Sequence, residues 1–226
     1  MKVLQIGKYY GLSGGIERVV YSLQSGSIEQ NTNMTNDVIS IHYKKHKSEE
    51  ITVASHATIY VEKSLVKVAS TAISISFIVK LKKIIANYDI IHLHHPNPMG
   101  TLALFLVGLT SRQKLMVHWH SDIIKQKTLF TFFKPLQDWL LKRADVIVGT
   151  SEKYIKHSEH LHPYLNKSIA IPIGIDGFNK INNSFLKEKY HGKKIIFSLG
   201  RLCYYKGFDT LIESASYLPD NYLILI

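Results

Sequence analysis

Two cations near the end of the chain have the types and spacing needed to bind a diphosphate. Arg201 and Lys206 follow an apolar stretch, residues 195–199, that predicts a buried strand, and a helix is expected to begin near residues 206–207. Ligands of open α/β sheets bind beyond the carboxyl ends of strands, and a helix N-terminus with flanking cations suits phosphate oxygens. Arg offers a planar fork and Lys a mobile point charge. Both could equally be surface cations on a loop.

A glycine-containing loop near the start offers a second place for phosphate. Residues 2–6 predict a strand, residues 7–15 (GKYYGLSGG) a loop that ends in Gly14 and Gly15, and residues 16–27 a helix. Such a unit can hold phosphate at the helix N-terminus. The loop matches neither GxGxxG nor GxxxxGK[ST], so an ordinary flexible turn is the alternative.

Histidines end two further predicted strands: one carries His92, His94 and His95, the other His118 and His120. Residues i and i+2 share one face of a strand, so a metal-dependent hydrolase built on His118, His120 and Asp122 is one alternative. No further His–Asp set completes such a site. A histidine at a strand end is more often packed or hydrogen-bonded than catalytic.

The composition describes a globular chain with excess positive charge. Of 226 residues, 46% are hydrophobic and 20% charged, and the formal net charge is +11. Residues 1–172 hold 21 Lys/Arg against 12 Asp/Glu, and residues 173–226 hold 7 against 5. This excess indicates an anionic partner, a phosphorylated substrate or anionic lipid rather than nucleic acid, because no nucleic-acid-binding motif is visible. The single cysteine, Cys203, excludes an internal disulfide.

Strands alternate with helices along the chain, which predicts an α/β fold with a doubly wound parallel sheet. Further strands are expected at residues 37–42, 58–61, 90–94, 114–118, 146–150, 169–175 and 222–226, and helices at 99–110, 129–142 and 152–160. Residues 177–194 are polar and lose periodicity. We therefore place a Rossmann-like domain at 1–176, and a linker with the incomplete start of a second one at 177–226.

Two segments combine apolar residues with lysines, as a helix on an anionic membrane surface does. Residues 66–88 predict a helix over their second half, and residues 129–142 predict a helix that Pro135 should kink or restart. Core packing on one face and a solvated basic face explain the same pattern, and we favour that reading for 66–88. No secretory signal is visible, and no apolar stretch reaches the roughly 20 residues of a membrane span. A soluble or peripheral protein is expected.

Four segments carry a more specific signal: HWHSD (118–122), ADVIVGTSE (144–152), IPIGID (171–176) and GRL-x3-KGFD (200–209). With them the chain resembles the retaining glycosyltransferases of family 4, which have the GT-B fold. The resemblance covers essentially all of the chain. Ile173 departs from it, because the family usually has Asn there.

The resemblance implies roles for five residues. His120 would face the cleft near the donor sugar, while Arg201 and Lys206 would bind the donor diphosphate. Gly14 and Gly15 would let the backbone approach the donor diphosphate or, alternatively, the acceptor. Neutral imidazole can donate to or accept from sugar hydroxyls. No Asp-x-Asp occurs, so we expect no metal and no cofactor besides the nucleotide-sugar substrate. The cations and helix N-termini would then stabilise the departing diphosphate.

The resemblance thus implies transfer of a hexose from a nucleotide-diphosphate sugar to a lipid-linked or surface-polysaccharide acceptor, and we favour mannose from a GDP donor. The protein would be cytoplasmic and peripheral at the inner face of the cell membrane. The first domain would hold the acceptor and the second the nucleotide sugar. The family's glutamate pair, eight positions apart, does not occur before Ile226. We therefore expect a second domain truncated early, with apolar surface left open. The alternative is a non-catalytic acceptor- or membrane-binding remnant.

Overall fold

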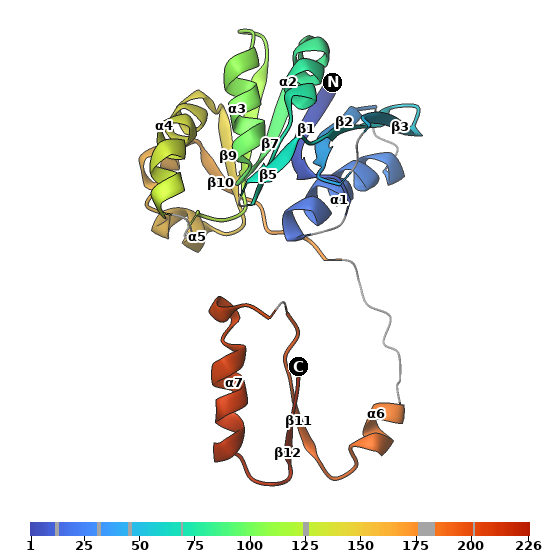
Figure 1. The fold of residues 1–226 in the computed structure, drawn as a ribbon, viewed down its shortest axis with the longest axis vertical. Helices are drawn as coiled ribbons and strands as arrows, with labels where there is room; N and C mark the ends of the chain where they lie inside the picture. The colour runs from blue at the N-terminus through green and yellow to red at the C-terminus, as the bar shows by residue number, and fades with distance from the viewer. Residues whose placement is uncertain are drawn as a thin grey trace. The chain divides into compact units, whose positions relative to one another are not determined.

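The chain forms two compact units, Met1–Gly174 and Ile175–Ile226. Figure 1 presents the computed structural model, in which each unit has its own sheet. The structure describes residues 1–11, 14–30, 33–44, 47–68, 70–123, 127–175, 184–200 and 202–226, without the side chains of 127–129, 184 and 187.

The first unit is built on an eight-stranded sheet of order β10-β9-β8-β7-β1-β2-β4-β3. Its strands are β1 (Lys2–Tyr9), β2 (Thr35–His42), β3 (Glu49–Ala54), β4 (Ala57–Lys63), β7 (Ile90–His95), β8 (Lys114–Trp119), β9 (Val146–Gly149) and β10 (Ser168–Ala170). Every neighbouring pair is parallel except β3 with β4. The predicted parallel, doubly wound sheet is confirmed, with one antiparallel edge strand added.

The direction of winding reverses between β1 and β7. From β1 the chain continues to β2 and β4 on one side, whereas β7 is followed by β8, β9 and β10 on the other. In open α/β sheets the crevice at such a switch point, beyond the carboxyl ends of the strands, is where ligands bind. The carboxyl ends of β1, β7 and β8 therefore define the edge of interest.

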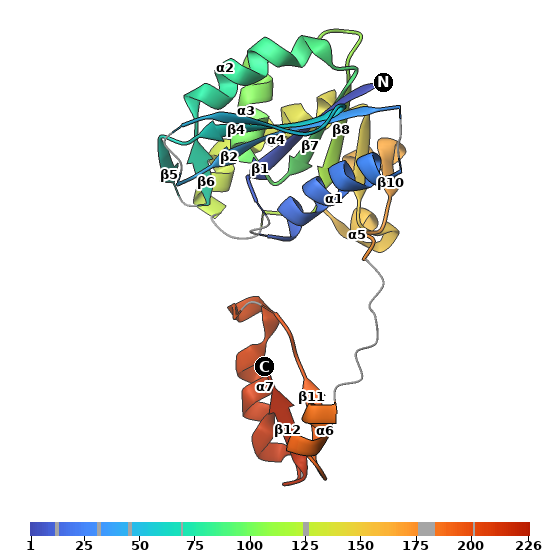
Figure 2. The same cartoon turned by 90° about the vertical axis from the view of Figure 1, so that its right-hand side faces the viewer.

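Helices cover both faces of this sheet, and Figure 2 shows α2 (Ile75–Ile84) and α1 (Gly15–Glu29) on opposite sides of it. One face packs Leu4, Ile6 and Leu93 against helices on the α2 side, and the other packs Val38 against Val20 of α1. The helices of this unit are α1 (Gly15–Glu29), α2 (Ile75–Ile84), α3 (Pro98–Val107), α4 (Lys127–Arg143) and α5 (Glu152–His157), with short 3₁₀ turns η1 (Ile85–Asn87) and η2 (His162–Lys167). Among the described residues, no helix is long and apolar enough to cross a membrane.

The second unit holds two parallel strands, β11 (Lys194–Phe197) and β12 (Tyr222–Leu225), with α7 (Phe208–Ser214) between them in the sequence. It also contains α6 (Ser184–Lys189), η3 (Tyr204–Lys206) and η4 (Ala215–Tyr217). The predicted strand–turn–helix–strand order is confirmed. Phe208 is buried, but the expected open apolar surface is present, since Phe197 and Leu199 are 66% and 85% exposed. Because parallel strands ordinarily bury both faces, the exposed apolar side chains of this unit are unusual for a two-stranded parallel sheet.

Three predicted elements differ from the structure. Residues 66–88 do end in a helix, but their first half forms a hairpin of β5 (Val66–Val68) and β6 (Thr71–Ile73). The predicted strand at 169–175 ends at Ala170, because Pro172 has no N–H to continue a ladder. Helix α4 is continuous through Pro135, so of the kink or restart that we expected there, the restart does not occur.

Candidate functional site

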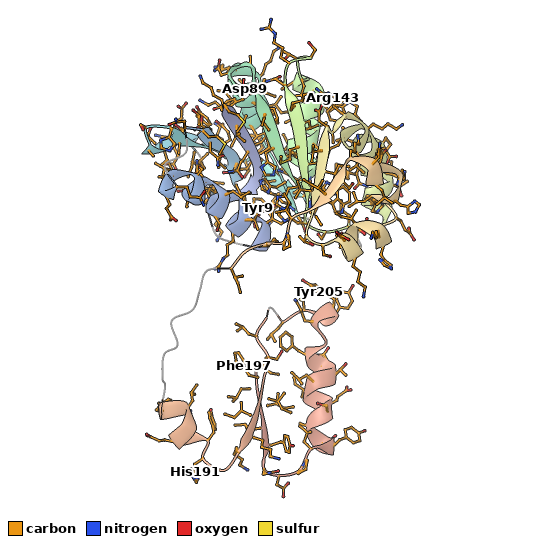
Figure 3. The ribbon with its side chains drawn as sticks, turned by 180° about the vertical axis from the view of Figure 1, so that it is seen from behind. Tyr9, Asp89, Arg143, His191, Phe197 and Tyr205 are labelled. Atoms are coloured by element: carbon orange, nitrogen blue, oxygen red, sulfur yellow. The ribbon has the colours of Figure 1, made fainter. Side chains whose placement is uncertain are left out.

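The switch point brings the ends of three strands to one edge of the first sheet. In Figure 3 Tyr9, the last residue of β1, lies at the edge opposite Asp89 and Arg143. Asn97, just after β7, holds this edge together: its amide donates to Gly7 O at 3.0 Å, and its Oδ1 accepts from the backbone N–H of Gly100 at 2.9 Å. The start of α3 is thereby fixed to the end of β1.

Four histidine rings stack at this edge: His92, His94, His118 and His120. Parallel pairing places His94 opposite His118, and the two-residue period of a strand puts all four on one face. Ring centroids of His92 and His94 lie 4.3 Å apart, and those of His118 and His120 lie 4.2 Å apart. The first three are buried, and His120 is half-buried.

A hydrogen-bond chain continues from the stack into the sheet. His120 Nε2 lies 3.0 Å from His94 Nδ1, and His94 Nε2 lies 3.0 Å from Gln5 Oε1. Gln5 in turn donates to Asn36 Oδ1 at 2.9 Å. Sequence reasoning singled out neither Gln5 nor Asn36. Gln5 could have been identified from the sequence, because it is a polar residue inside the apolar run of β1.

Burial keeps the histidines of the stack neutral. Desolvation lowers the pKa of His92 and His120 to about 3 and that of His118 to about 4, and it lowers the pKa of His94 well below the ordinary value. Neighbouring histidines lower the pKa of His92, His94 and His120 further. No carboxylate in the described part of the chain is hydrogen-bonded to the stack to offset this. The edge therefore offers uncharged donors and acceptors at neutral pH.

The predicted set for a metal hydrolase does not assemble. Among the described residues, the group with suitably close ligand nitrogens is His92, His94 and His118, within 4.8 Å of one another, and it includes neither His120 nor Asp122. Both ring nitrogens of His94 are hydrogen-bonded, Nδ1 to His120 and Nε2 to Gln5, so His94 has no free nitrogen for a metal. Asp122 instead accepts hydrogen bonds from Trp119, Tyr154 and Ser158 at 2.8–2.9 Å.

Gly14 and Gly15 lie at the N-terminus of α1. A β-carbon at Gly14 would lie 2.5 Å from the carboxylate of Glu17, which is folded over this helix end and buried. A β-carbon at Gly15 would meet nothing within 4 Å. Burial lowers the pKa of nearby Lys8, and Glu17 acts in the opposite direction. The open side of this helix end is therefore at Gly15, with one acid and one amine beside it.

The two predicted diphosphate cations belong to the second unit. Lys206 ends η3, and Gly207 follows with a positive φ of 68°, which only glycine adopts without strain, before α7 begins. Arg201 lies outside the described residues. His120, Gly14 and Gly15 all lie in the first unit, at the carboxyl edge of its sheet.

Stability should fall in acid, because the folded chain keeps these histidines neutral. Their pKa values in the unfolded chain are near 6.5, so below about pH 6.5 the unfolded chain takes up protons that the folded chain does not. The free energy of unfolding should then fall by about 1.4 kcal/mol per pH unit for each such histidine, down to about pH 4. Urea unfolding at pH 7.5, 6 and 5 measures this slope.

His92→Phe keeps an aromatic ring in the stack and removes one titrating group, so its slope should be shallower. Ile147→Val is the control: it removes a buried methyl group, lowers stability at every pH by about 0.5–1.5 kcal/mol, and should leave the slope unchanged. Equal slopes for all three proteins would contradict the buried neutral state of His92.

The model of Glycosyltransferase Family 4 matches residues 13–176. The O-antigen chain mannosyltransferase C of Escherichia coli is 32% identical over 222 residues, which are 95% of this chain and 58% of that protein. The D-rhamnosyltransferase WbpZ of Pseudomonas aeruginosa is 31% identical over 224 residues, covering 95% of this chain and 56% of WbpZ. The chain thus spans somewhat over half the length of these curated relatives.

A solved structure supports the fold. The crystal structure of the Anabaena protein HepE in complex with UDP superposes with a TM-score of 0.66 at 16% sequence identity, over 99% of this chain and 60% of that one. At this sequence identity the similarity is evidence for the fold alone, and the shared fold agrees with the predicted GT-B fold. The family model covers most of the first unit and supplies the membership. The chain belongs to glycosyltransferase family 4.

Proposed function

We propose that the protein is a retaining, metal-independent glycosyltransferase. It would move a hexose from a nucleotide-diphosphate sugar to a lipid-linked or surface-polysaccharide acceptor. Membership of the family supports glycosyl transfer, and so do the two relatives, an O-antigen chain mannosyltransferase and a D-rhamnosyltransferase. The single observation that carries the proposal is the buried, uncharged histidine edge at the switch point. Sugar hydroxyls need such neutral donors and acceptors, and ligands of this fold class bind there.

Mannose from a GDP donor is our preferred substrate. The mannosyltransferase of E. coli supports mannose, whereas the rhamnosyltransferase of P. aeruginosa points to a deoxyhexose, and HepE was solved with UDP. The deciding experiment incubates the protein, as its source makes it, with a lipid-linked saccharide acceptor and with GDP-mannose, GDP-rhamnose or UDP-glucose in turn. Sugar transfer and donor binding are both measured. Turnover of GDP-mannose alone supports our choice, and turnover of another donor alone replaces it. Binding of none favours the non-catalytic remnant.

Within this proposal Arg201 and Lys206 neutralise the departing diphosphate. In the protein as its source makes it, Arg201→Ala and Lys206→Ala should each lower kcat by roughly 10²–10³-fold, the scale of one lost transition-state contact. Lys194→Ala is the matched control, since Lys194 is an exposed lysine of the same unit whose ammonium group lies near Tyr222. Initial rates with saturating donor check this. Unchanged turnover in either variant would remove that residue from the diphosphate site.

Gly15 would allow the donor to approach the N-terminus of α1. Gly15→Ala fits the fold, because its methyl group meets nothing, so stability should not fall. The methyl group would nevertheless hold a phosphate away from the backbone N–H groups, and KM for the donor should rise about tenfold, the loss of about one charge-assisted hydrogen bond. Gly26→Ala, equally unobstructed in the same helix, should leave KM unchanged. Equal KM values in both variants would assign Gly15 to the helix alone.

We also propose that the protein is peripheral at the inner, cytoplasmic face of the cell membrane. An exposed patch beside α2 combines apolar and basic side chains that line one surface: Leu65, Ile75, Val79, Lys63 and Lys83. Helix α2 packs Phe77 and Leu81 into the core, whereas Ile75 and Val79 are exposed and take no part in core packing. Apolar area plus lysines is what binds an anionic bilayer.

Vesicle binding tests this patch. The double variant Leu65→Glu/Ile75→Glu should weaken binding to vesicles containing anionic lipid at least tenfold, because it removes apolar area and adds two charges repelled by the surface. Leu165→Glu, an exposed leucine of η2 outside this patch, is the control and should bind like the unaltered protein. Equal binding by all three proteins, or no preference for anionic over neutral vesicles, would contradict the membrane proposal.

A further inference from the structure

The hydrogen-bond chain of the first unit has a direction that begins at helix α1. Asn36 Nδ2 lies 3.1 Å from the backbone carbonyl of Leu23 and 3.2 Å from Ser27 Oγ. A carbonyl oxygen can only accept, so the amide nitrogen of Asn36 must face it. Asn36 therefore presents Oδ1 to the sheet, where it accepts from Gln5 Nε2 at 2.9 Å.

The orientation of Asn36 fixes that of Gln5. With its NH₂ group donating to Asn36, Gln5 presents Oε1 to His94 Nε2 at 3.0 Å. An amide oxygen accepts and cannot donate, so Nε2 is the protonated nitrogen of His94. His94 is fully buried and its pKa is well below the ordinary value, so the ring is neutral and Nδ1 carries a lone pair.

The lone pair of His94 in turn fixes His120. His94 Nδ1 lies 3.0 Å from His120 Nε2, and since Nδ1 has no proton, Nε2 of His120 must donate. His120 is neutral as well, so its remaining nitrogen, Nδ1, carries a lone pair. That nitrogen has no hydrogen-bond partner within the described ranges.

We propose that Asn36, Gln5 and His94 act as a relay that sets the tautomer of His120, so that His120 presents an unprotonated Nδ1. This nitrogen is an acceptor, and the ligand group that it takes is a hydroxyl or another N–H or O–H donor. The relay stands on the hydrogen bonds together with the neutral state of the buried His94 ring and the half-buried His120 ring. The identity of the hydroxyl, one on the sugar donor or acceptor, rests on the proposed function. Gln5, Asn36 and His94 are thus positioning residues.

Nitrogen-15 NMR reads the tautomer without any turnover. In ¹⁵N-labelled protein, two-bond ¹H–¹⁵N correlations distinguish a protonated from an unprotonated ring nitrogen, and the signals of His120 are those missing in His120→Ala. The unaltered protein should show Nε2–H for both His94 and His120. A proton on Nδ1 of His120 would overturn the relay, and this result needs no variant of Gln5.

Gln5→Leu tests the direction of the relay. Without the amide oxygen, the His94–His120 hydrogen bond can run either way, so the Nδ1 signal of His120 should move toward that of a protonated nitrogen. Val3→Ala changes the same face of the same strand, two residues earlier, and should leave the tautomer unchanged. A His120 spectrum in Gln5→Leu identical to that of Val3→Ala would overturn the relay.

Turnover separates the relay from the proposed function. If both hold, Gln5→Leu should lower kcat about tenfold with little change in KM, whereas Val3→Ala should not, since about 1.4 kcal/mol corresponds to one tenfold change in rate. His120→Ala should lower kcat at least as much. Full activity of His120→Ala with the expected spectra would overturn the role of His120 in transfer and leave the relay intact. If His120→Ala lowers kcat strongly but the spectra show a proton on Nδ1 of His120, the relay is overturned and the role of His120 in transfer stands.

Discussion

The carboxyl edge of the first sheet depends on one constraint: polar side chains that are buried there must stay uncharged, including His95 and His118, whose ring nitrogens have no hydrogen-bond partner among the described residues. A buried polar group without a partner costs free energy, and a buried charge costs far more. Gln5, Asn36 and His94 meet this constraint through a chain of neutral hydrogen bonds that starts at a backbone carbonyl of α1. The packing of α1 against β2 and the tautomer of the half-buried His120 ring at the edge are therefore not independent.

The two faces of β1 differ in character: one is part of the apolar core and the other carries the hydrogen-bond chain. On one face, Leu4 and Ile6 of β1 pack into the large core with α2, α3 and α4. On the other face, Gln5, which lies between them in sequence, links Asn36 to His94 in the polar chain. Because successive side chains of a strand point to opposite faces, one strand serves both purposes. A shift of a single residue in the pairing of β1 would place Gln5 in the apolar core.

Patterns of single segments made much of this fold predictable. Alternating strands and helices predicted the doubly wound sheet, and the ends of 90–94 and 114–118 correctly placed the histidines at strand termini. The pairing of Gln5 with His94 was out of reach, because it depends on β1 and β7 being neighbours and on their register. Asp122 shows the same limit: its sequence position suggested a ligand, but its partners Tyr154 and Ser158 come from a distant helix region. The hairpin at 66–73 was missed because its strands are only three residues long, too short for an alternating pattern to be told from chance.

The place of β1 in the sheet also bears on the order in which the chain can fold. Its pairing with β2 joins residues 33 positions apart, as between Lys2 and Thr35, whereas Gln5 and His94 are separated by 89. A ribosome releases the chain from its N-terminus, so β1 and β2 can meet early, and the other edge of β1 stays unpaired until β7 has been made. Contacts so far apart in sequence form slowly, and an unpaired strand edge is prone to aggregation. The nascent first unit is thus most exposed to misassembly while residues between β2 and β7 are being synthesised.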